Sequence, residues 1–221
     1  MSRVTPLVLF DLDGTLIDSA PDLAGAANAM RAARSLAPLP LAALRPMVGS
    51  GARGMVGTAF GLGPGDAGFD DLRHEFLARY EAALLKKTAV FVDMAPVLDR
   101  LDALGQRWGI VTNKAARFTQ PVVEGLHLHR RAAVVISGDT TPHAKPHPAP
   151  LLEAARRVGV EAGGCVYVGD DQRDMVAGRA AGMTTLAAAW GYLGQGESIE
   201  AWGAHAVLAN PAALLHWLQL A

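Results

Sequence analysis

The stretch Leu7-Val8-Leu9-Phe10-Asp11-Leu12-Asp13-Gly14-Thr15 decides both the fold and the chemistry of this chain. Residues 7–10 are all apolar and predict a buried strand that ends where the chain turns at Gly14. Because alternate residues of a strand share a face, Asp11 and Asp13 would point the same way if the strand continued, and with a turn at Gly14 they lie at the mouth of a buried sheet. Two carboxylates there repel each other unless a cation, a proton or a reacting group lies between them. A strand followed by a solvated acidic turn is the alternative, and the rest of the chain argues against it.

The composition is that of an ordinary globular protein and excludes several classes of partner. The length of 221 residues predicts one or two domains, and with 51% hydrophobic and 19% charged residues the chain can bury a sizeable core. A formal net charge of −1 and scattered basic residues predict no nucleic-acid or membrane partner. We see no apolar run long enough for a bilayer span or a signal peptide. The single cysteine, Cys165, fits a reducing compartment, so we expect a cytoplasmic protein.

Apolar strands alternate with amphipathic helices along most of the chain. Strands are expected at 7–10, 108–111, 133–136, 165–168, 185–189 and 206–208, with helices near 95–104, 117–126, 149–158, 173–181 and 212–218. This repetition predicts an α/β fold, a doubly wound, mostly parallel sheet covered on both faces. Between residues 17 and 88 we find no convincing strand, and the longest helices are expected at about 21–36 and 70–87. We therefore expect a Rossmann-like core of residues 1–16 and 89–221, with an inserted all-helical cap domain at residues 17–88.

Polar side chains follow three of the expected strands at the point where each strand ends. They are Asp11 and Asp13 after the first strand, Thr112 and Asn113 after the second, and Asp170, Asp171 and Asp174 after the fourth. Ligands of open parallel sheets bind beyond the carboxyl ends of the strands. The sequence therefore predicts that these side chains converge in one crevice.

A set of carboxylates with a lysine and a hydroxyl predicts a phosphoryl-transfer site. Oxygen ligands of this kind suit a hard cation, and Mg²⁺ combines few protein carboxylates with waters and a substrate phosphate. Lys145 lies in a loop just before a helix, from which it reaches the same crevice, and Thr112 adds a hydroxyl donor. Such cations and donors hold the charge of the transferring oxygens. Either Asp11 or Asp13 can attack phosphorus to give an aspartyl phosphate, and the other then protonates the leaving alkoxide and later activates water.

These residues, in this order, resemble the haloacid dehalogenase-like hydrolases, most closely the phosphoglycolate phosphatase type with a helical cap. The matching motifs are Asp11-Leu12-Asp13-Gly14-Thr15, Thr112-Asn113, Lys145-Pro146, and Gly169-Asp170-Asp171 followed by Asp174. The resemblance implies that Asp11 is the nucleophile and Asp13 the general acid and base. It also implies that Thr112 and Lys145 hold the phosphoryl group and that Lys145 restrains Asp11. The helical insert would then be a mobile cap that closes over the substrate and excludes bulk water.

The resemblance also implies a magnesium site. Mg²⁺ would be bound by Asp11, the carbonyl of Asp13 and Asp170, with Asp174 in support. Asp171 stands where many relatives carry Ser, which leaves open which of the acids touch the metal directly.

The reaction class follows from Asp13. In the family this sequence resembles, dehalogenating members keep no acid at that position, because they protonate no alkoxide, so Asp13 favours phosphate esters. Hydrolysis is preferred over a sugar-phosphate mutase, since it needs only water after the first transfer. A non-catalytic phosphate-binding or signalling module, such as a receiver domain, is the alternative of another class, and the complete motif set argues against it. The sequence leaves the oligomeric state, monomer or dimer, open.

The expected substrate is a small-molecule phosphate ester that carries a carboxylate. The resemblance implies phosphoglycolate as the first candidate. The segment from Ser50 to Gly54 also resembles a subgroup that acts on N-acetylmuramic acid 6-phosphate, so this or another sugar phosphate is the second candidate. Arg53 is expected to pair with the carboxylate, because a guanidinium binds this group bidentately. Ser50, Gly51 and Asn113 are expected beside it as further substrate contacts.

The segment Gly49-Ser50-Gly51-Ala52-Arg53-Gly54 also fits the G-x-G-x-x-G pattern of dinucleotide sites. Pro46 stands where the preceding strand should be, and no β-α-β unit surrounds the segment. We therefore interpret it as a cap loop whose amides meet the substrate, with a plain turn between helices as the alternative.

Overall fold

The computed structural model describes residues 5–221, and its centre is a six-stranded sheet. The strands are β1 (Val8–Phe10), β4 (Trp108–Val111), β5 (Val135–Ile136), β6 (Val166–Gly169), β7 (Thr184–Ala188) and β8 (Ala206–Leu208). They lie in the order β5-β4-β1-β6-β7-β8, and every neighbouring pair is parallel. The α/β sheet predicted from the alternating pattern is confirmed.

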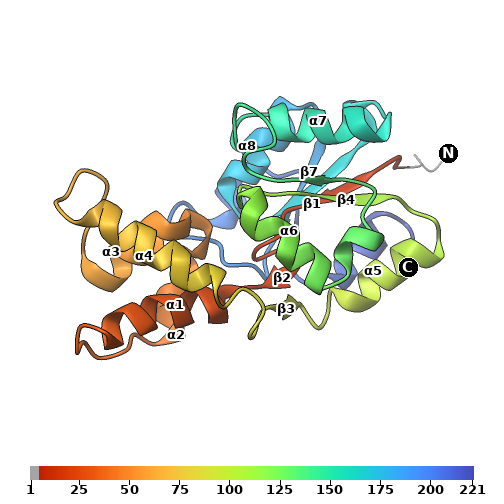
Figure 1. The fold of residues 1–221 in the computed structure, drawn as a ribbon. Coiled ribbons are helices and arrows are strands. Elements are labelled where there is room, and N and C mark those ends of the chain that lie inside the picture. The colour runs from red at the N-terminus through yellow and green to blue at the C-terminus, as the bar shows by residue number, and fades with distance from the viewer. Residues whose placement is uncertain (1–4) are drawn as a thin grey trace.

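Helices cover both faces of this sheet, as Figure 1 shows for α5 (Ala95–Ala103) and α6 (Ala116–Gly125) on one side and α7 (Ala149–Val158) and α8 (Gln172–Ala180) on the other. Val8 and Phe10 belong to the hydrophobic cluster that includes α5, α6 and α9 (Ala212–Trp217). Leu7 and Leu9 belong to the cluster that includes α7 and α8. The first strand is apolar throughout because each of its faces packs against a helical layer.

A separate group of helices lies beyond the end of β1 (Figure 1). It consists of α1 (Ala20–Ala32), α2 (Leu41–Leu44), the 3₁₀ helix η1 (Arg45–Ser50), α3 (Gly51–Phe60) and α4 (Phe69–Glu81). Shorter 3₁₀ turns in the core are η2 (Leu128–Arg130), η3 (Ala162–Gly164) and η4 (Ile199–Trp202). Within residues 5–221, none of the helices combines the length and the apolar character that a membrane crossing requires.

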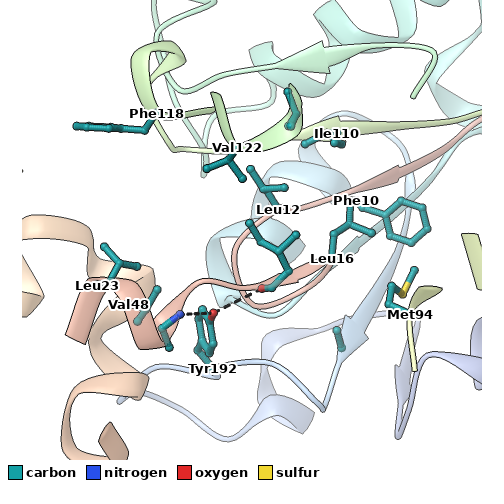
Figure 2. Close-up of a cluster of buried hydrophobic side chains, with 14 of the residues drawn as sticks. Phe10, Leu12, Leu16, Leu23, Val48, Met94, Ile110, Phe118, Val122 and Tyr192 are labelled. Atoms are coloured by element: carbon teal, nitrogen blue, oxygen red, sulfur yellow. Dashed lines mark hydrogen bonds between the residues drawn. The ribbon is translucent and has the colours of Figure 1, made fainter. Parts of the chain in front are cut away.

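The hydrophobic interior runs from the sheet into the helical group without a break. Leu23 of α1 and Val48 of η1 belong to the same cluster as Phe10 and Leu12 (Figure 2). Between them lies Tyr192, whose hydroxyl oxygen accepts hydrogen bonds from the amides of Ser19 (2.8 Å) and Ala20 (3.1 Å) at the start of α1. Apolar packing and these hydrogen bonds together fix where the helical group leaves the core.

The two linkers between core and helical group form a small ribbon. β2 (Ile17–Asp18) pairs antiparallel with β3 (Ala89–Val90). The prediction of no strand between residues 17 and 88 is therefore wrong at its first two positions. Nothing in the local pattern of residues 17–18 signals a strand, since the pairing arises only because both linkers cross the same gap side by side.

The helix expected at residues 70–87 ends earlier, at Glu81. Its pattern is correct as far as Tyr80, but the buried carboxylate of Asp22 accepts hydrogen bonds from the amides of Lys87 (2.9 Å) and Thr88 (2.8 Å). Those amides can no longer donate to carbonyls one helical turn back, so the chain leaves the helix before it reaches them. The Gly-rich segment at residues 48–54, expected as a loop, instead forms the end of η1 and the start of α3.

Candidate active site

The candidate site lies at the carboxyl edge of the sheet, where the strand order reverses. β1 is flanked by β4 on one side and β6 on the other, so the connections leave this point in opposite directions and open a crevice. A cavity of about 480 Å³ lies there between the core and the helical group. Its lining includes the predicted residues Asp11, Asp13, Ser50, Gly51, Thr112, Asn113, Lys145, Asp170 and Asp174. The structure thus brings these predicted positions together.

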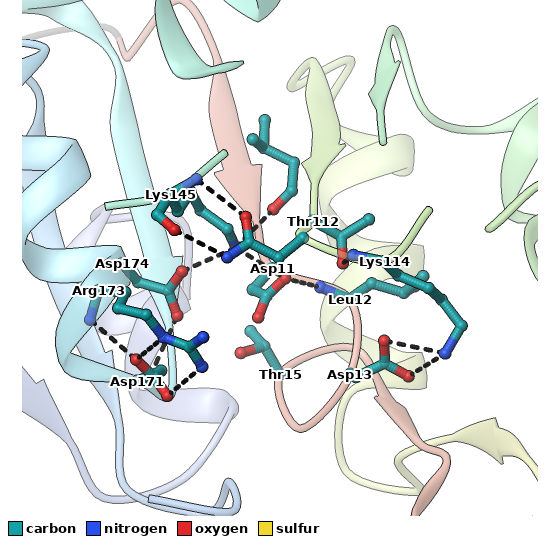
Figure 3. Close-up of polar contacts among 12 residues, drawn as sticks. Asp11, Leu12, Asp13, Thr15, Thr112, Lys114, Lys145, Asp171, Arg173 and Asp174 are labelled. Atoms are coloured by element: carbon teal, nitrogen blue, oxygen red, sulfur yellow. Dashed lines mark hydrogen bonds and ion pairs between the residues drawn. The ribbon is translucent and has the colours of Figure 1, made fainter. Parts of the chain in front are cut away.

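Asp11 stands directly after β1 and is held in place by a buried ammonium group. Its Oδ1 lies 2.9 Å from Nζ of Lys145 and accepts a hydrogen bond from the amide of Leu12 at 2.7 Å (Figure 3). Burial raises the pKa of Asp11 to about 7, against the opposing effect of Lys145 and with a further rise from the charge of Asp174. Lys145 is the group that favours the ionised carboxylate a nucleophile requires.

Lys145 is itself fixed by partners from several elements. Its side chain is 2% exposed, and Nζ lies 2.8 Å from Asp174 Oδ1, 3.0 Å from the carbonyl of Val111 and 2.7 Å from the hydroxyl of Tyr167. Burial alone would lower the pKa of Lys145, but Asp11 and Asp174 raise it above its usual value. The lysine is therefore charged and points at Asp11 in one defined orientation.

Asp170, the first acid after β6, is buried and hydrogen-bonded. Asp170 accepts hydrogen bonds from the hydroxyl of Thr15 at 2.8 Å and from the amide of Tyr192 at 2.8 Å. Burial, followed by the charges of Asp11 and Asp174, raises its pKa well above the usual value. A Cβ atom on Gly14 would lie 2.2 Å from Asp170 Oδ2, so the turn after β1 has room only for glycine.

These acids fit a hard divalent cation. Carboxylate oxygens of Asp11, Asp170 and Asp174 all lie within 4.8 Å of one another. The donors are all oxygen. Burial is the main cause of the raised pKa values of Asp11 and Asp170, and neighbouring carboxylates add a repulsion that a cation between them would remove. Both carboxylate oxygens of Asp174 already have partners within the protein. Its Oδ1 pairs with Lys145, and its Oδ2 accepts a hydrogen bond from the amide of Asp171 at 3.2 Å.

Asp13, the predicted general acid and base, lies on the side of the cavity nearest the helical group. Nζ of Lys114 lies 2.9 Å and 3.1 Å from its two carboxylate oxygens (Figure 3). The hydroxyl of Ser19 donates a hydrogen bond to Oδ1 of Asp13. The same ammonium donates to the hydroxyl of Tyr80, on α4, at 2.7 Å. Lys114 therefore connects the acid of the core to a side chain of the helical group.

Sequence reasoning did not assign Lys114 or Tyr80 to the site. Lys114 directly follows Thr112-Asn113 at the end of a strand, which is the same signal that identified its neighbours. Tyr80 lies among the apolar positions of the helix expected at residues 70–87, a pattern that predicts core packing, and its ring is buried. Burial raises its pKa to about 12, so the hydroxyl that faces Lys114 stays protonated.

Thr112 and Asn113 have different hydrogen-bond partners. Thr112 is buried at the end of β4, and its Oγ1 accepts a hydrogen bond from the amide of Lys114 at 3.1 Å. The carboxamide of Asn113 accepts from the amide of Lys145 and donates to the carbonyl of Lys145, both at 2.9 Å. Asn113, expected to contact substrate, ties the loop that carries Lys145 to the end of β4.

The structure places Arg53 apart from the other predicted residues. Its side chain is exposed on α3, and it is absent from the described lining of the cavity, whereas its neighbours Ser50 and Gly51 belong to that lining. The predicted contact between Arg53 and a substrate carboxylate therefore has no counterpart in the described lining of the cavity.

Comparison with known proteins gives the family. A family model described as haloacid dehalogenase-like hydrolase matches residues 8–188. A phosphoglycolate phosphatase from Xanthomonas campestris pv. campestris is 48% identical over 213 residues, covering 96% of this chain and 96% of that protein. An N-acetylmuramic acid 6-phosphate phosphatase from Pseudomonas putida is 39% identical over 207 residues, covering 94% and 93%.

The fold agrees with these sequence matches. The crystal structure of a predicted phosphoglycolate phosphatase from Haemophilus somnus is similar with a TM-score of 0.83 at 25% sequence identity, covering 96% of this chain and 97% of that chain. The family model runs from β1 to the end of β7, so it includes the strand ends that carry Asp11, Thr112 and Asp170 and the loop that carries Lys145. The chain therefore belongs to the haloacid dehalogenase-like hydrolases.

Proposed function

We propose that this protein is a Mg²⁺-dependent phosphate monoester hydrolase that acts through an aspartyl-phosphate on Asp11, with phosphoglycolate as its first candidate substrate. The observation that carries the proposal is the position of Asp11 in the cavity, fixed through Oδ1 by Lys145 and by the amide of Leu12. Among the described residues, the hydrogen bonds to this carboxylate engage Oδ1, which leaves Oδ2 for attack on phosphorus.

The two acids of the first motif divide the chemistry. Asp11 Oδ2 forms a bond to phosphorus while the bond between phosphorus and the ester oxygen breaks. Asp13 donates a proton to that leaving oxygen, and then takes a proton from the water that attacks the aspartyl phosphate. The second step releases inorganic phosphate, returns Asp11 as a carboxylate and leaves Asp13 protonated for the next cycle. Thr112 and Lys145 hold the phosphoryl oxygens throughout.

Asp11, Asp170 and the carbonyl of Asp13 would hold Mg²⁺, supported by Asp174. When bound, Mg²⁺ supplies positive charge that offsets the clustered carboxylates and the phosphoryl oxygens. Without a divalent cation the same acids repel an incoming phosphate dianion. Activity should therefore disappear in EDTA and return when Mg²⁺ is added.

Two substrates merit a direct comparison. Phosphoglycolate is favoured by the name of the relative at 48% identity, and N-acetylmuramic acid 6-phosphate by the name of the relative at 39% identity. A cavity of about 480 Å³ with apolar walls that include Leu23, Phe76 and Phe118 is an argument for the larger ester, because such volumes enclose ligands well above a two-carbon acid in size. Both esters carry the carboxylate expected from the sequence.

The experiment is phosphate release in the presence of Mg²⁺ from each ester, compared as kcat/KM. A preference of at least about a hundredfold for one ester, or about 2.7 kcal/mol, would assign the substrate. Release of phosphate from neither ester nor from an aryl phosphate would reject the hydrolase and favour a binding module. Phosphate moved between positions of a sugar, without release, would instead identify a mutase.

Asp11→Asn tests the nucleophile. The amide is a poor nucleophile, so we expect phosphate release to fall below detection for every ester while the far-ultraviolet circular dichroism spectrum stays the same. Matched measurements on Asp99→Asn, an exposed acid on α5, should retain parental activity. Near-normal turnover by Asp11→Asn would remove Asp11 from this role.

A further inference from the structure

We propose that Arg173, oriented by Asp171, docks the helical group onto the core and so sets the fraction of molecules in which the cavity is closed over the substrate. Both residues lie at the start of α8, next to the catalytic acids, and both line the cavity. Neither has a role in the chemistry proposed above.

Arg173 links the two parts of the molecule through one guanidinium group. Its Nε lies 2.7 Å from Asp171 Oδ1 and its Nη2 lies 2.8 Å from Asp171 Oδ2, which is a bidentate pair (Figure 3). The same Nη2 donates to the carbonyl of Gly49, in η1 of the helical group. One side chain thus spans the boundary between core and helical group beside the site.

Asp171 is a rigid support for this contact. Its Oδ1 also accepts a hydrogen bond from the amide of Arg173 at 2.9 Å and caps α8, while its own amide donates to Asp174. Both of its oxygens are therefore committed to Arg173. The acid that stands where many relatives carry Ser thus orients the arginine, and it lies outside the described cluster of Asp11, Asp170 and Asp174.

The position of Gly49 shows how closely the two surfaces meet. A Cβ atom at Gly49 would lie 3.1 Å from Asp171 Oδ2 and 3.4 Å from Arg173 Nη2. The chain continues from Gly49 directly into Ser50 and Gly51, which line the cavity at the start of α3. Holding Gly49 therefore holds the part of the helical group that faces the substrate.

The kinetic consequence follows from the docking equilibrium. If only a fraction of the molecules is docked, the apparent affinity for substrate falls by that fraction, while saturating substrate restores the docked form. A charge-assisted hydrogen bond contributes enough to change such an equilibrium about tenfold. Loss of the Arg173 contact should therefore raise KM about tenfold and leave kcat nearly unchanged.

The test combines kinetics with a distance measurement that does not depend on activity. Nitroxide labels are attached to Asp71→Cys on α4 and Gln120→Cys on α6, both exposed positions, while Cys165 is buried and stays unlabelled. Double electron–electron resonance then compares the parent with Arg173→Ala, Asp171→Asn and Arg173→Lys, each with Mg²⁺. We expect the distance distribution between the labels to shift to longer values and to broaden in the first two variants. Arg173→Lys should give an intermediate distribution, because lysine keeps the charge but cannot form the bidentate pair.

Arg179→Ala is the matched control. Arg179 lies on the same helix and donates to the carbonyls of Trp202 and Gly203, both in the core. This variant should keep the parental distances and KM. Parental distances in Arg173→Ala, or a loss confined to kcat with KM unchanged, would overturn the docking role. If no phosphatase activity is found for the parent, the distances alone still decide the matter.

Discussion

Asp11, Asp170 and Asp174 share one buried corner of the molecule with the ammonium group of Lys145. The energetic consequence is unfavourable for the metal-free fold, because buried carboxylates repel one another and one lysine offsets only part of the charge. Sites arranged for catalysis commonly reduce stability in this way. The pKa values of Asp11 and Asp170 are raised first by burial and then by neighbouring carboxylates, which are the same two unfavourable effects.

This conflict predicts how the stability of the metal-free protein depends on pH. The pKa of Asp11 is about 7 in the folded chain, against a usual value of 3.8. Between these two values the unfolded chain has released a proton that the folded chain still holds, so the free energy of unfolding falls as pH rises. We expect the melting temperature in EDTA to drop between about pH 4 and pH 7, measured by differential scanning fluorimetry.

Asp170→Asn is the variant that checks the cause. It removes a carboxyl group whose ionisation the fold disfavours but the unfolded chain allows, so the metal-free melting temperature near pH 7 should rise and its dependence on pH should flatten. With excess Mg²⁺ the order should reverse, because the parent gains binding energy that the variant lacks. An unchanged pH profile in Asp170→Asn would show that the acidic cluster does not govern stability.

Arg53 is the residue whose assignment depends most on the sequence. It is exposed outside the cavity lining, yet it lies on the helix that begins at the cavity. If α3 brings Arg53 to a substrate carboxylate, Arg53→Ala should lower kcat/KM for phosphoglycolate about tenfold more than for an aryl phosphate without a carboxylate. Equal losses for both esters would exclude Arg53 from substrate recognition.

Sequence patterns predicted a site residue best where the pattern that identifies it, such as an apolar strand, lies directly beside it in the chain. Asp11, Thr112 and Asp170 follow apolar strands directly, so strand periodicity and the rule for parallel sheets were enough to bring them together. Tyr80 and Arg173 escaped assignment because their contacts, Tyr80 with Lys114 and Arg173 with Gly49, join distant parts of the chain. Contacts of that kind depend on how the helical group sits on the core, which local pattern does not encode.

The boundaries of helices and strands were also predicted correctly where a local pattern sets them and incorrectly where a contact with a distant segment sets them. The helix predicted at residues 149–158 has those bounds, because an amphipathic pattern ends at Gly159, which adopts a left-handed conformation with φ of 72°. α4 is shorter than its pattern suggested, and β2 and β3 carry almost no strand signal of their own. In each of these cases a tertiary contact overrides the local preference.

Asp22, on α1, holds the linker that leads from the helical group back to the core at residues 87–88. Its Oδ2 accepts hydrogen bonds from the amides of Lys87 and Thr88 and from the hydroxyl of Thr88 at 2.7 Å. Asp22→Ala would leave these donors without a partner, and we expect the free energy of unfolding to fall by about 2–3 kcal/mol in urea denaturation.

Asp70→Ala is the control for that effect. Asp70 also lies in the first turn of a helix, but its side chain is 80% exposed and its ion pair with Arg73 is long, at 3.7 Å. Its loss should cost about 0.5 kcal/mol or less. A similar cost for both variants would mean that Asp22 acts only through the helix dipole and not by holding the linker.

At the scale of the whole molecule, the core and the helical group share one hydrophobic interior. Leu23 and Val48 pack in the same cluster as Phe10, and Tyr192 adds hydrogen bonds across the junction. We therefore expect a single cooperative thermal transition, with the calorimetric enthalpy equal to the van't Hoff enthalpy. Two resolved transitions in scanning calorimetry would show that the helical group unfolds by itself.

The composition of the cavity walls limits how the helical insert can be exchanged between family members. Its walls come from both sides of the boundary, with Phe76 and Tyr80 contributed by the helical group and Lys114 and Phe118 by the core. A chimera that receives only the helical insert of another family member would inherit half of a binding surface and face mismatched partners at Lys114 and Arg173. Substrate preference in this scaffold is thus a property of a matched pair of surfaces, and a successful graft must carry the strand-end residues along with the helices.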